Sequence, residues 1–231
     1  IRDYQKGQTL TVENPDKPKL QLLIDQGKYF ACVEDDVDKV QADIDLMNAW
    51  SKDASERMKI TIDTAVLANI VTEVHASNEG ATAGAISGDI NLGVTSTPVA
   101  ITKTNVLEYL VDLGTVLDEA NAPESDRFCV IPAKMAGYIK KSDLKDASLT
   151  GDGTSVMRNG RLGMIDRFTL YVSHNLPVSS SEFDIIAGHK MGFTFASQMT
   201  EMETLRSTTT FGDIIRGLQV YGFKTVKPEA L

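Results

Sequence analysis

The run LDEANAPESDRFCVIP, from Leu117 to Pro132, decides more about the fold of this chain than any other stretch. Its first residues complete a helical pattern, which Asn121, Ala122 and Pro123 bring to an end. RFCVIP follows as a short apolar run that is typical of a buried strand. A helix, a turn and a buried strand in this order predict a domain that mixes helices with strands.

The residues on both sides of this run continue the alternation. Upstream, Thr104 or Asn105 begins the helix, and Glu108 is placed to complete a capping box with Asn105. Downstream, AKMAGYIKKSDL predicts a helix, and LGMIDRFTLYVS predicts a strand pair or one long strand before a turn at Asn175 to Pro177. The polar run KKSDLKDASLTGDGTSVMRNG between them predicts a loop. The buried face of the upstream helix is expected to consist of Leu107, Leu110, Gly114 and Leu117.

Strand patterns also lie near both ends of the chain. From Lys28 to Glu34, Tyr29, Ala31 and Val33 alternate with Phe30 and Cys32, and we expect this strand to be packed on both faces. EMETLRS and IIRGLQVYGFKTVKP, within residues 201–228, predict strands that join the same sheet. The intervening residues are then inserted within that domain, and such non-local pairing predicts slow folding.

The acidic cluster EDDVD, from Glu34 to Asp38, lies where a strand ends and a helix begins. A calcium loop needs ligands at alternating positions, and Val40 stands where the third ligand would be. We therefore predict that Asp35 or Asp36 caps the helix and that the positive end of the helix dipole stabilises the carboxylate of Asp38 in the first turn.

An apolar stripe continues after this cap at spacings of three, four or seven residues, which predicts a helical surface. We expect two helices in tandem, with a bend or break between Asn48 and Asp53, and Trp50 as a packing anchor. The stripe consists of Val37, Val40, Ile44, Met47, Ala54, Met58, Ile62, Val66, Ile70 and Val74.

Residues 76–103 are rich in Gly, Ala, Ser, Thr and Asn and carry no helical stripe. The segment exceeds the usual loop length of about 12 to 15 residues, and short strands are expected in DINLGV and PVAIT. Its glycines match neither GxGxxG nor GxxxxGK[ST]. Two interpretations stay open: a contact with a neighbouring subunit, or a variable insertion without a role.

The composition is that of a globular protein. The 231 residues are 42% hydrophobic and 24% charged, enough for one sizeable core or two small ones. The net charge of -9 argues against a protein that grips phosphate backbones through clustered Lys and Arg. No apolar run approaches the ~18 residues needed to span a bilayer. Cys32 and Cys129, the two cysteines, are expected to be buried and reduced.

The three histidines form no recognisable catalytic or metal-binding pattern. His174 follows Ser173 directly, and consecutive strand residues point to opposite faces, so the two cannot converge. His189 follows a glycine, His75 lies far away in the sequence, and HExxH is absent. We predict surface or turn histidines and no catalytic, cofactor-binding or metal-binding residue.

Four blocks, in their order and separation, resemble the major capsid proteins of tailed bacteriophages, which share the Hong Kong 97-type fold. The resemblance implies an α+β fold with a peripheral domain made of a long spine helix and a sheet, an inserted axial domain and a truncated E-loop arm. Relatives often have Gly where Arg167 precedes Phe168, which argues against a tight turn there. The blocks are Leu117–Pro132, Arg158–Pro177, Ile185–Gln198 and Phe211–Pro228, and the run Leu22–Asp45 extends the match.

The resemblance also implies domain boundaries. Residues 1–27 are expected to be a remnant of the E-loop and N-terminal arm; the partner strand is missing, so the chain looks truncated and this segment should be mobile or ordered only by neighbours. Residues 28–121 are expected to form the peripheral domain, with the spine helix from about residue 54 to 75 and an insertion at 76–104. The axial domain is expected at 122–200 and the returning peripheral strands at 201–231.

A structural major capsid protein, not an enzyme, is the function that the resemblance implies. Such a protein assembles into pentamers and hexamers of an icosahedral phage head around double-stranded DNA. Expected partners are further copies of the chain, scaffolding and portal proteins, and DNA bound without sequence specificity, with no membrane and no cofactor. The expected location is the virion, after assembly in the host cytoplasm.

Two other functions stay open from the sequence. One is an encapsulin-like shell protein that encloses cargo, and the other is a hydrolase that uses His174 or His189 with a carboxylate. Some members of the resembling family crosslink their subunits through Lys and Asn side chains near a Glu. No residue of this chain is assigned that role.

Overall fold

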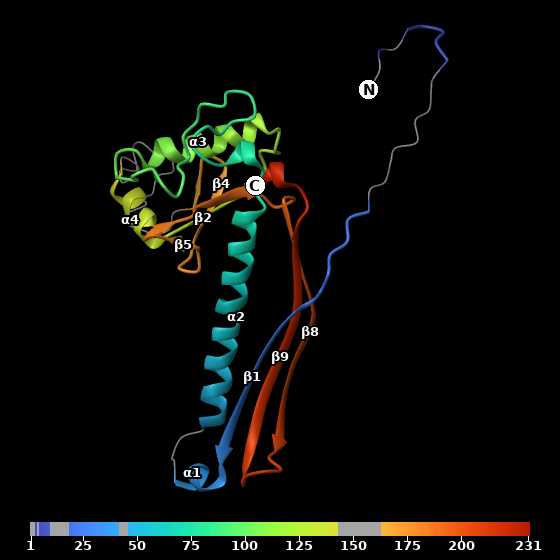
Figure 1. The fold of residues 1–231 in the computed structure, drawn as a ribbon, viewed down its shortest axis with the longest axis vertical. Helices are drawn as coiled ribbons and strands as arrows, with labels where there is room; N and C mark the ends of the chain where they lie inside the picture. Colours follow the sequence, from blue (N-terminus) through green and yellow to red (C-terminus); the bar gives the residue numbers. More distant parts are fainter. Residues whose placement is uncertain (1–2, 4, 10–18, 42–45, 143–162) are drawn as a thin grey trace.

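The computed structural model describes residues 3, 5–9, 19–41, 46–142 and 163–231, which form a long stalk with a head at one end (Figure 1). The stalk, residues 26–41, 46–72 and 193–225, contains a long helix beside a three-stranded sheet. The head, residues 76–142 and 163–192, contains a four-stranded sheet with two helices. The predicted mixture of helices and strands is confirmed.

The stalk sheet has the strand order β1-β9-β8, so its central strand comes from the end of the chain. β1 (Gln26–Asp35) pairs antiparallel with β9 (Gly212–Thr225), and β9 pairs antiparallel with β8 (Phe193–Arg206). This pairing confirms the strands predicted near both ends of the chain. The head is inserted between β1 and β8.

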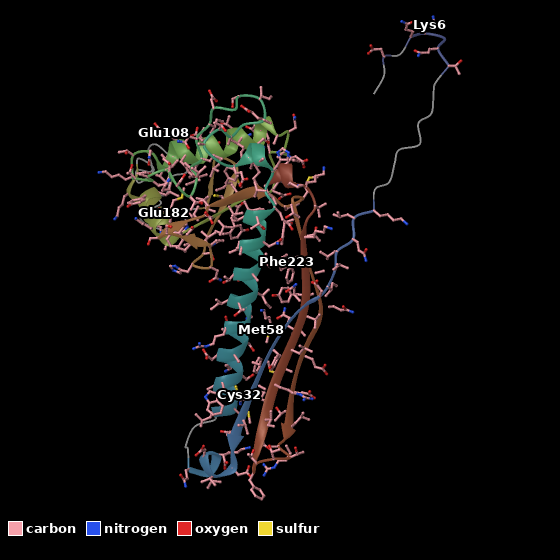
Figure 2. The ribbon with its side chains drawn as sticks, viewed as in Figure 1. Lys6, Cys32, Met58, Glu108, Glu182 and Phe223 are labelled. Carbon is pink, nitrogen blue, oxygen red and sulfur yellow. The ribbon has the colours of Figure 1, made fainter. Side chains whose placement is uncertain are left out.

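Helix α2 (Leu46–Thr72) covers one face of the stalk sheet (Figure 1). Its 27 residues span about 40 Å at about 1.5 Å per residue. The predicted stripe is at least half-buried from Met47 onward, and Ile62 and Ile70 are buried most deeply. Figure 2 shows Met58, Cys32 and Phe223 in the layer between helix and sheet.

The expected break between Asn48 and Asp53 is wrong, because α2 is continuous there. Ser51 fits the helix because its Oγ donates to Met202 Sδ of β8. The two helices divide earlier, between α1 (Asp36–Gln41) and α2, across residues outside the described part of the chain. Trp50 is 38% exposed, so it is no buried anchor.

Helix α1 lies at the distal end of the stalk (Figure 1). The backbone N–H of Val37 donates to Asp35 Oδ1 at 3.0 Å, which confirms the predicted cap. Val37 and Val40 were expected in the buried stripe, but they are 58% and 87% exposed. The short helix turns this face to solvent instead of toward the sheet.

Only one face of β1 is packed, contrary to the expectation. Phe30 lies over Gly217 so closely that a Cβ added there would be 2.4 Å from Phe30 Cε1. Tyr29 and Val33 point to the opposite face and are 80% and 51% exposed. The reason is that, within the described ranges, α2 is the one layer that covers the sheet.

The head sheet has the order β3-β4-β2-β7. Its inner strand β2 runs parallel to β4 and antiparallel to β7, while β3 and β4 form a hairpin. Helices α3 and α4 pack on it around Leu110, Ile131, Ile139 and Phe168, so α3 shares the core of the head. The bounds are α3 Val106–Glu119, β2 Arg127–Ile131, α4 Ala133–Lys141, β3 Met164–Ile165, β4 Phe168–Val172, β5 Val178–Ser179, β6 Glu182–Phe183 and β7 Ile186–His189.

The capping box predicted for α3 does not form. Asn105 makes no side-chain cap; its Oδ1 accepts from the N–H of Thr102 at 2.7 Å, and its Nδ2 donates to the carbonyl of Ala100 at 2.9 Å. The side chain therefore holds the turn upstream of the helix, and it is not free to cap the helix itself.

The tight turn that the sequence argued against does form. Asp166 and Arg167 have φ values of 46° and 65° and connect Ile165 to its partner Phe168. Two consecutive left-handed residues match the twist of a two-residue hairpin. Arg167 tolerates this backbone because its guanidinium donates to Asp118 at 2.8 Å.

Residues 76–103 form a short 3-10 helix, Ala76–Asn78, and a compact loop. The strands expected here reduce to isolated bridges, such as that between Ala83 and Ile90, and PVAIT forms none. The Tyr109 hydroxyl donates to the carbonyl of Leu92 at 3.1 Å and so fastens the loop to α3. The loop predicted at 140–160 lies, from residue 143 onward, outside the described residues.

Leu231 joins the head to the stalk. Its side chain is 3% exposed and belongs to a cluster with Ile70 of α2 and Ile186 of β7. A Cβ added at Gly188 or Gly192 would lie within 2.8 Å of it, so both positions need glycine for this packing. Head and stalk thus share buried contacts.

Candidate assembly interface

The stalk sheet carries an exposed, largely apolar face on the side away from α2, which we call the bare face. Tyr29 lies opposite Leu218, and Val33 lies opposite Ile214, which is also opposite Leu205 on β8. Tyr29 is 80% exposed, Val33 51%, Leu205 39% and Leu218 37%. A sheet normally buries its apolar face against a second layer, but no helix or sheet among the residues that the structure describes covers the bare face.

One ion pair crosses the middle of the bare face. Ala31, Arg216 and Glu203 lie side by side on the three strands, and the Arg216 guanidinium pairs with the Glu203 carboxylate. The face therefore offers apolar area on both sides of this ion pair, and the exposed Glu201 lies opposite Leu218 on one of these sides. This combination of apolar area and fixed charge is typical of interfaces that must select one register.

The chain before β1 crosses one end of the sheet and then leaves the stalk (Figure 1). Leu23 passes so close to Gly222 that a Cβ added to that glycine would be 2.0 Å from the Leu23 carbonyl oxygen. Lys224 Nζ also donates to the carbonyl of Gln21 at 3.1 Å. Leu20 and Leu23 are 56% and 60% exposed, so the described part of this arm adds apolar surface.

A second exposed apolar cluster, the distal tip, consists of Val37, Val40 and Phe211. Phe211, in the turn between β8 and β9, is 83% exposed. The N–H of Asp36 donates to the Phe211 carbonyl at 3.0 Å and so holds this turn against the start of α1. Two segments far apart in the sequence therefore build one end of the stalk.

Ion pairs stabilise the distal tip. Arg206 pairs with both Asp36 and Asp213, and Lys39 Nζ lies 3.0 Å from Asp213. The Arg206 hydrogen bond lowers the pKa of Asp36, and those from Lys39 and then Arg206 lower the pKa of Asp213. At neutral pH these carboxylates are charged and connect α1 to the hairpin.

The head contains a groove of about 960 Å³ between the 76–101 segment, α4 and the β5–β6 hairpin. Its walls are mostly aliphatic, and burial raises the pKa of Asp184 at one side. Of the residues that the structure describes, no histidine or cysteine lines the groove. The groove therefore contains neither His174 nor His189, the histidines that the hydrolase alternative would use.

The structure keeps the three histidines on separate elements. The His75 ring accepts from the N–H of Ser77, and His174 is exposed after β4. His189, which was expected at the surface or in a turn, is 4% exposed, and its Nδ1 accepts from the N–H of Met191 at 3.2 Å. That prediction is wrong for His189, because the ring packs inward at the end of β7.

The two cysteines are free thiols, as predicted, but only Cys129 is fully buried. Burial raises the pKa of the Cys129 thiol to about 12, which makes it unreactive. In the part of the chain that is described, no three His, Cys, Asp or Glu side chains are grouped to hold a metal ion. Among the same residues, no helix is long and apolar enough to span a bilayer.

A buried arginine fixes the edge of the head. Arg127 donates to the carbonyls of Pro123, Gly114 and Ala122 and to Asp118 Oδ1, the last at 2.6 Å. Partial desolvation acts to raise the pKa of Asp118, but the hydrogen bonds from Arg167 and Arg127 outweigh this effect and lower the pKa overall. Sequence analysis missed this network, since neither Arg127 in RFCVIP nor Asp118 shows a pairing pattern.

Comparisons with known proteins find similarity to phage capsid proteins. The family model described as phage capsid protein matches residues 21–231. A chain from Mycobacterium phage Che8 has a TM-score of 0.72 and 26% identity, over 90% of this chain and 70% of that chain. No curated protein matches the chain.

Two further solved structures share the fold at lower identity. A chain from the capsid of the cyanophage P-SCSP1u has a TM-score of 0.65 and 17% identity, over 100% of this chain and 78% of that chain. A chain from the mature capsid of bacteriophage PhiM1 has a TM-score of 0.63 and 14% identity, over 100% of this chain and 76% of that chain.

Proposed function

The chain belongs to the phage capsid protein family, and we propose that it assembles with further copies of itself into the closed shell of a phage head. Such a protein is structural, and its surfaces perform the function. The observation that carries the proposal is the bare face, where no second layer from the described part of the chain covers Tyr29, Val33 and Leu218. In a shell, a neighbouring copy supplies that layer.

We propose a Hong Kong 97-type arrangement for this subunit. The stalk, with α2 beside its sheet, corresponds to the peripheral domain and its spine helix, and the head corresponds to the axial domain. The proposed boundaries remain 1–27, 28–121, 122–200 and 201–231. The packing of α3 in the core of the head favours counting residues 106–119 with the axial part.

Two different patches per subunit explain how such a shell closes. A contact between unlike patches repeats head to tail and forms a ring when the rotation closes. The proposed rings are pentamers and hexamers, and the arm before β1 and the distal tip are the parts that join one ring to the next. Many weak contacts of this kind become collectively strong in a closed particle.

The remaining parts of the proposal concern the contents and the setting of the shell. We propose that the particle is an icosahedral virion head that holds double-stranded DNA without sequence recognition. The net charge of -9 supports a container wall that does not grip the phosphate backbone. Scaffolding and portal proteins are the proposed assembly partners, in the host cytoplasm.

Electron microscopy of the protein co-expressed with its scaffolding protein tests the proposal. We expect closed particles of uniform diameter. Discrete dimers or tetramers alone would contradict it. If the particles are closed, nuclease-protected DNA inside them supports a phage head, whereas a co-purifying enzyme inside them supports the encapsulin-like alternative.

A further inference from the structure

The turn of residues 84–88 at the surface of the head presents one apolar side chain. Ile86 is the large apolar residue in GATAGAISGD, where the other residues are small or polar, and it is 82% exposed. A single exposed isoleucine on a mobile loop would need no explanation. The backbone beneath Ile86 is, however, held in one conformation.

Glu119 of α3 provides the first restraint. Its Oε2 accepts hydrogen bonds from the N–H groups of Ile86 and Ser87, at 2.8 and 2.9 Å. These two bonds, from Ser87 and then Ile86, lower the pKa of the Glu119 carboxyl, so it is charged at neutral pH. A carboxylate that accepts two backbone N–H groups holds a turn firmly.

Two glycines provide the second restraint. Gly84 and Gly88 have φ values of 107° and 61°, and the N–H of Gly88 donates to the carbonyl of Gly84. A Cβ added to Gly84 would lie 2.3 Å from Ser87 Oγ and 2.8 Å from Glu119 Oε2. The turn therefore depends on glycine both for its backbone angles and for its contact with Glu119.

The base of the turn is equally well built. Ala83 is fully buried and exchanges both backbone hydrogen bonds with Ile90, at 2.8 and 3.1 Å. The N–H of Gly84 donates to the carbonyl of Ser77 at 2.8 Å. Ile86 thus stands on a rigid base, which is the condition under which an exposed side chain binds without a large ordering cost.

The helix that holds the turn extends the apolar surface. Val111, Thr115 and Glu119 are four residues apart, so they share one face of α3. Val111 on this face is 51% exposed. Glu108 and Asp112 border it, and burial, followed by repulsion from Glu108, raises the pKa of Asp112.

We propose that Ile86 and the outer face of α3 bind a neighbouring copy of this chain, with Ile86 as the anchor. The inference rests on the proposed function, because a shell surrounds every head with identical heads. It assigns a role to the 76–104 insertion and selects the contact interpretation over an insertion without a role. The preorganised turn and the exposed Val111 are two separate observations that indicate the same side of the head.

Cysteine labelling during assembly tests the contact directly. In the Ile86→Cys variant, a maleimide should modify residue 86 readily in free subunits and at least about tenfold more slowly in assembled particles. Peptide mass spectrometry reports residue 86 separately from Cys32 and Cys129. Equal labelling rates in free and assembled protein would overturn the proposal.

A variant series separates this contact from the fold. Ile86→Ser should raise the protein concentration needed for half-maximal assembly about tenfold or more, whereas Ile86→Leu should stay near the wild type. Glu119→Ala should weaken assembly while Ile86 is still present, because the turn loses both backbone restraints. Unchanged assembly by Ile86→Ser would sink the proposal.

Controls distinguish a failure of the proposed function from a failure of the Ile86 contact alone. Since Ile86 is 82% exposed, thermal unfolding of Ile86→Ser should match the wild type. Wild-type protein that forms no particles refutes the proposed function, and the Ile86 contact is refuted with it. Wild-type particles together with unaffected Ile86→Ser particles refute the contact alone.

Discussion

Replacing Tyr29 by Ser should abolish assembly and leave the fold intact. Tyr29 is 80% exposed on the bare face. A tyrosine buries about 200 Å², so about 160 Å² is free to be covered, worth up to about 4 kcal/mol at about 25 cal/mol per Å². The remaining fifth contributes about 1 kcal/mol or less to folding. Tyr29→Ser should therefore weaken assembly much more than it weakens folding.

Phe30 is the matched control, because it is the next residue on the same strand and points to the opposite face. Its ring lies over Gly217 in the layer under α2. Phe30→Ser should lower the free energy of unfolding by about 2–4 kcal/mol, in the lower range for a phenylalanine that is only half-buried. The two neighbours thus have opposite expected effects.

Two assays separate these effects. Thermal or urea unfolding of the free subunit reports the fold, and sedimentation with electron microscopy reports assembly. Tyr29→Ser should lose about 1 kcal/mol or less of unfolding free energy and remain in the slowly sedimenting fraction. Normal particles from Tyr29→Ser, or a loss of subunit stability equal to that of Phe30→Ser, would refute the assignment of the bare face.

Three further predictions concern the stability of the subunit. Gly217→Ala should cost about 1–3 kcal/mol of unfolding free energy in urea melts, because its Cβ would lie 2.4 Å from Phe30; a neutral effect would show that the ring moves freely. Arg127→Ala should cost about 3–5 kcal/mol by the same measurement, since it leaves buried carbonyls unpaired; a loss below about 1 kcal/mol would contradict this. The pKa of Asp118 is lowered in the folded state, so its contribution to the free energy of unfolding is complete above the usual pKa range of Asp and is lost as the pH falls below about 4. The stability of Asp118→Asn should therefore fall less steeply with acid than that of the wild type, and identical stability-against-pH profiles would contradict this prediction.

Periodicity predicted the elements whose surroundings are regular. The stripe from Met47 to Val74 and the alternation from Lys28 to Glu34 follow directly from helical and strand geometry. The helix and the strand that they predict both form, although only one face of the strand is packed. Local chemistry predicted the Asp35 cap for the same reason, because a cap depends on neighbours in sequence. The helices and strands predicted within residues 104–142 and 163–173 were found close to their expected positions, whereas the short strands expected within 76–103 were not.

Predictions that depended on distant residues were less successful. Asn105 caps nothing because the turn from Ala100 uses its side chain, and the 166–167 turn forms without glycine because Asp118 binds Arg167. His189 is buried where a surface position was expected. For Asn105 and Arg167, a partner in another turn or on another element offsets the local preference of the residue, and the His189 ring packs inward at the end of β7.

The amino-acid sequence by itself determined which segments become helices and strands and which family the chain resembles, because local spacing and motif order are properties of the chain alone. Only the tertiary structure decided which apolar residues are exposed. Tyr29, Ile86 and Phe211 look like core residues in the sequence, and they are exposed because one helix covers one face of the sheet and tight turns hold the other two outward. Whether a residue is buried depends on the layer that packs against it, and that layer forms only when segments that are distant in the sequence come together.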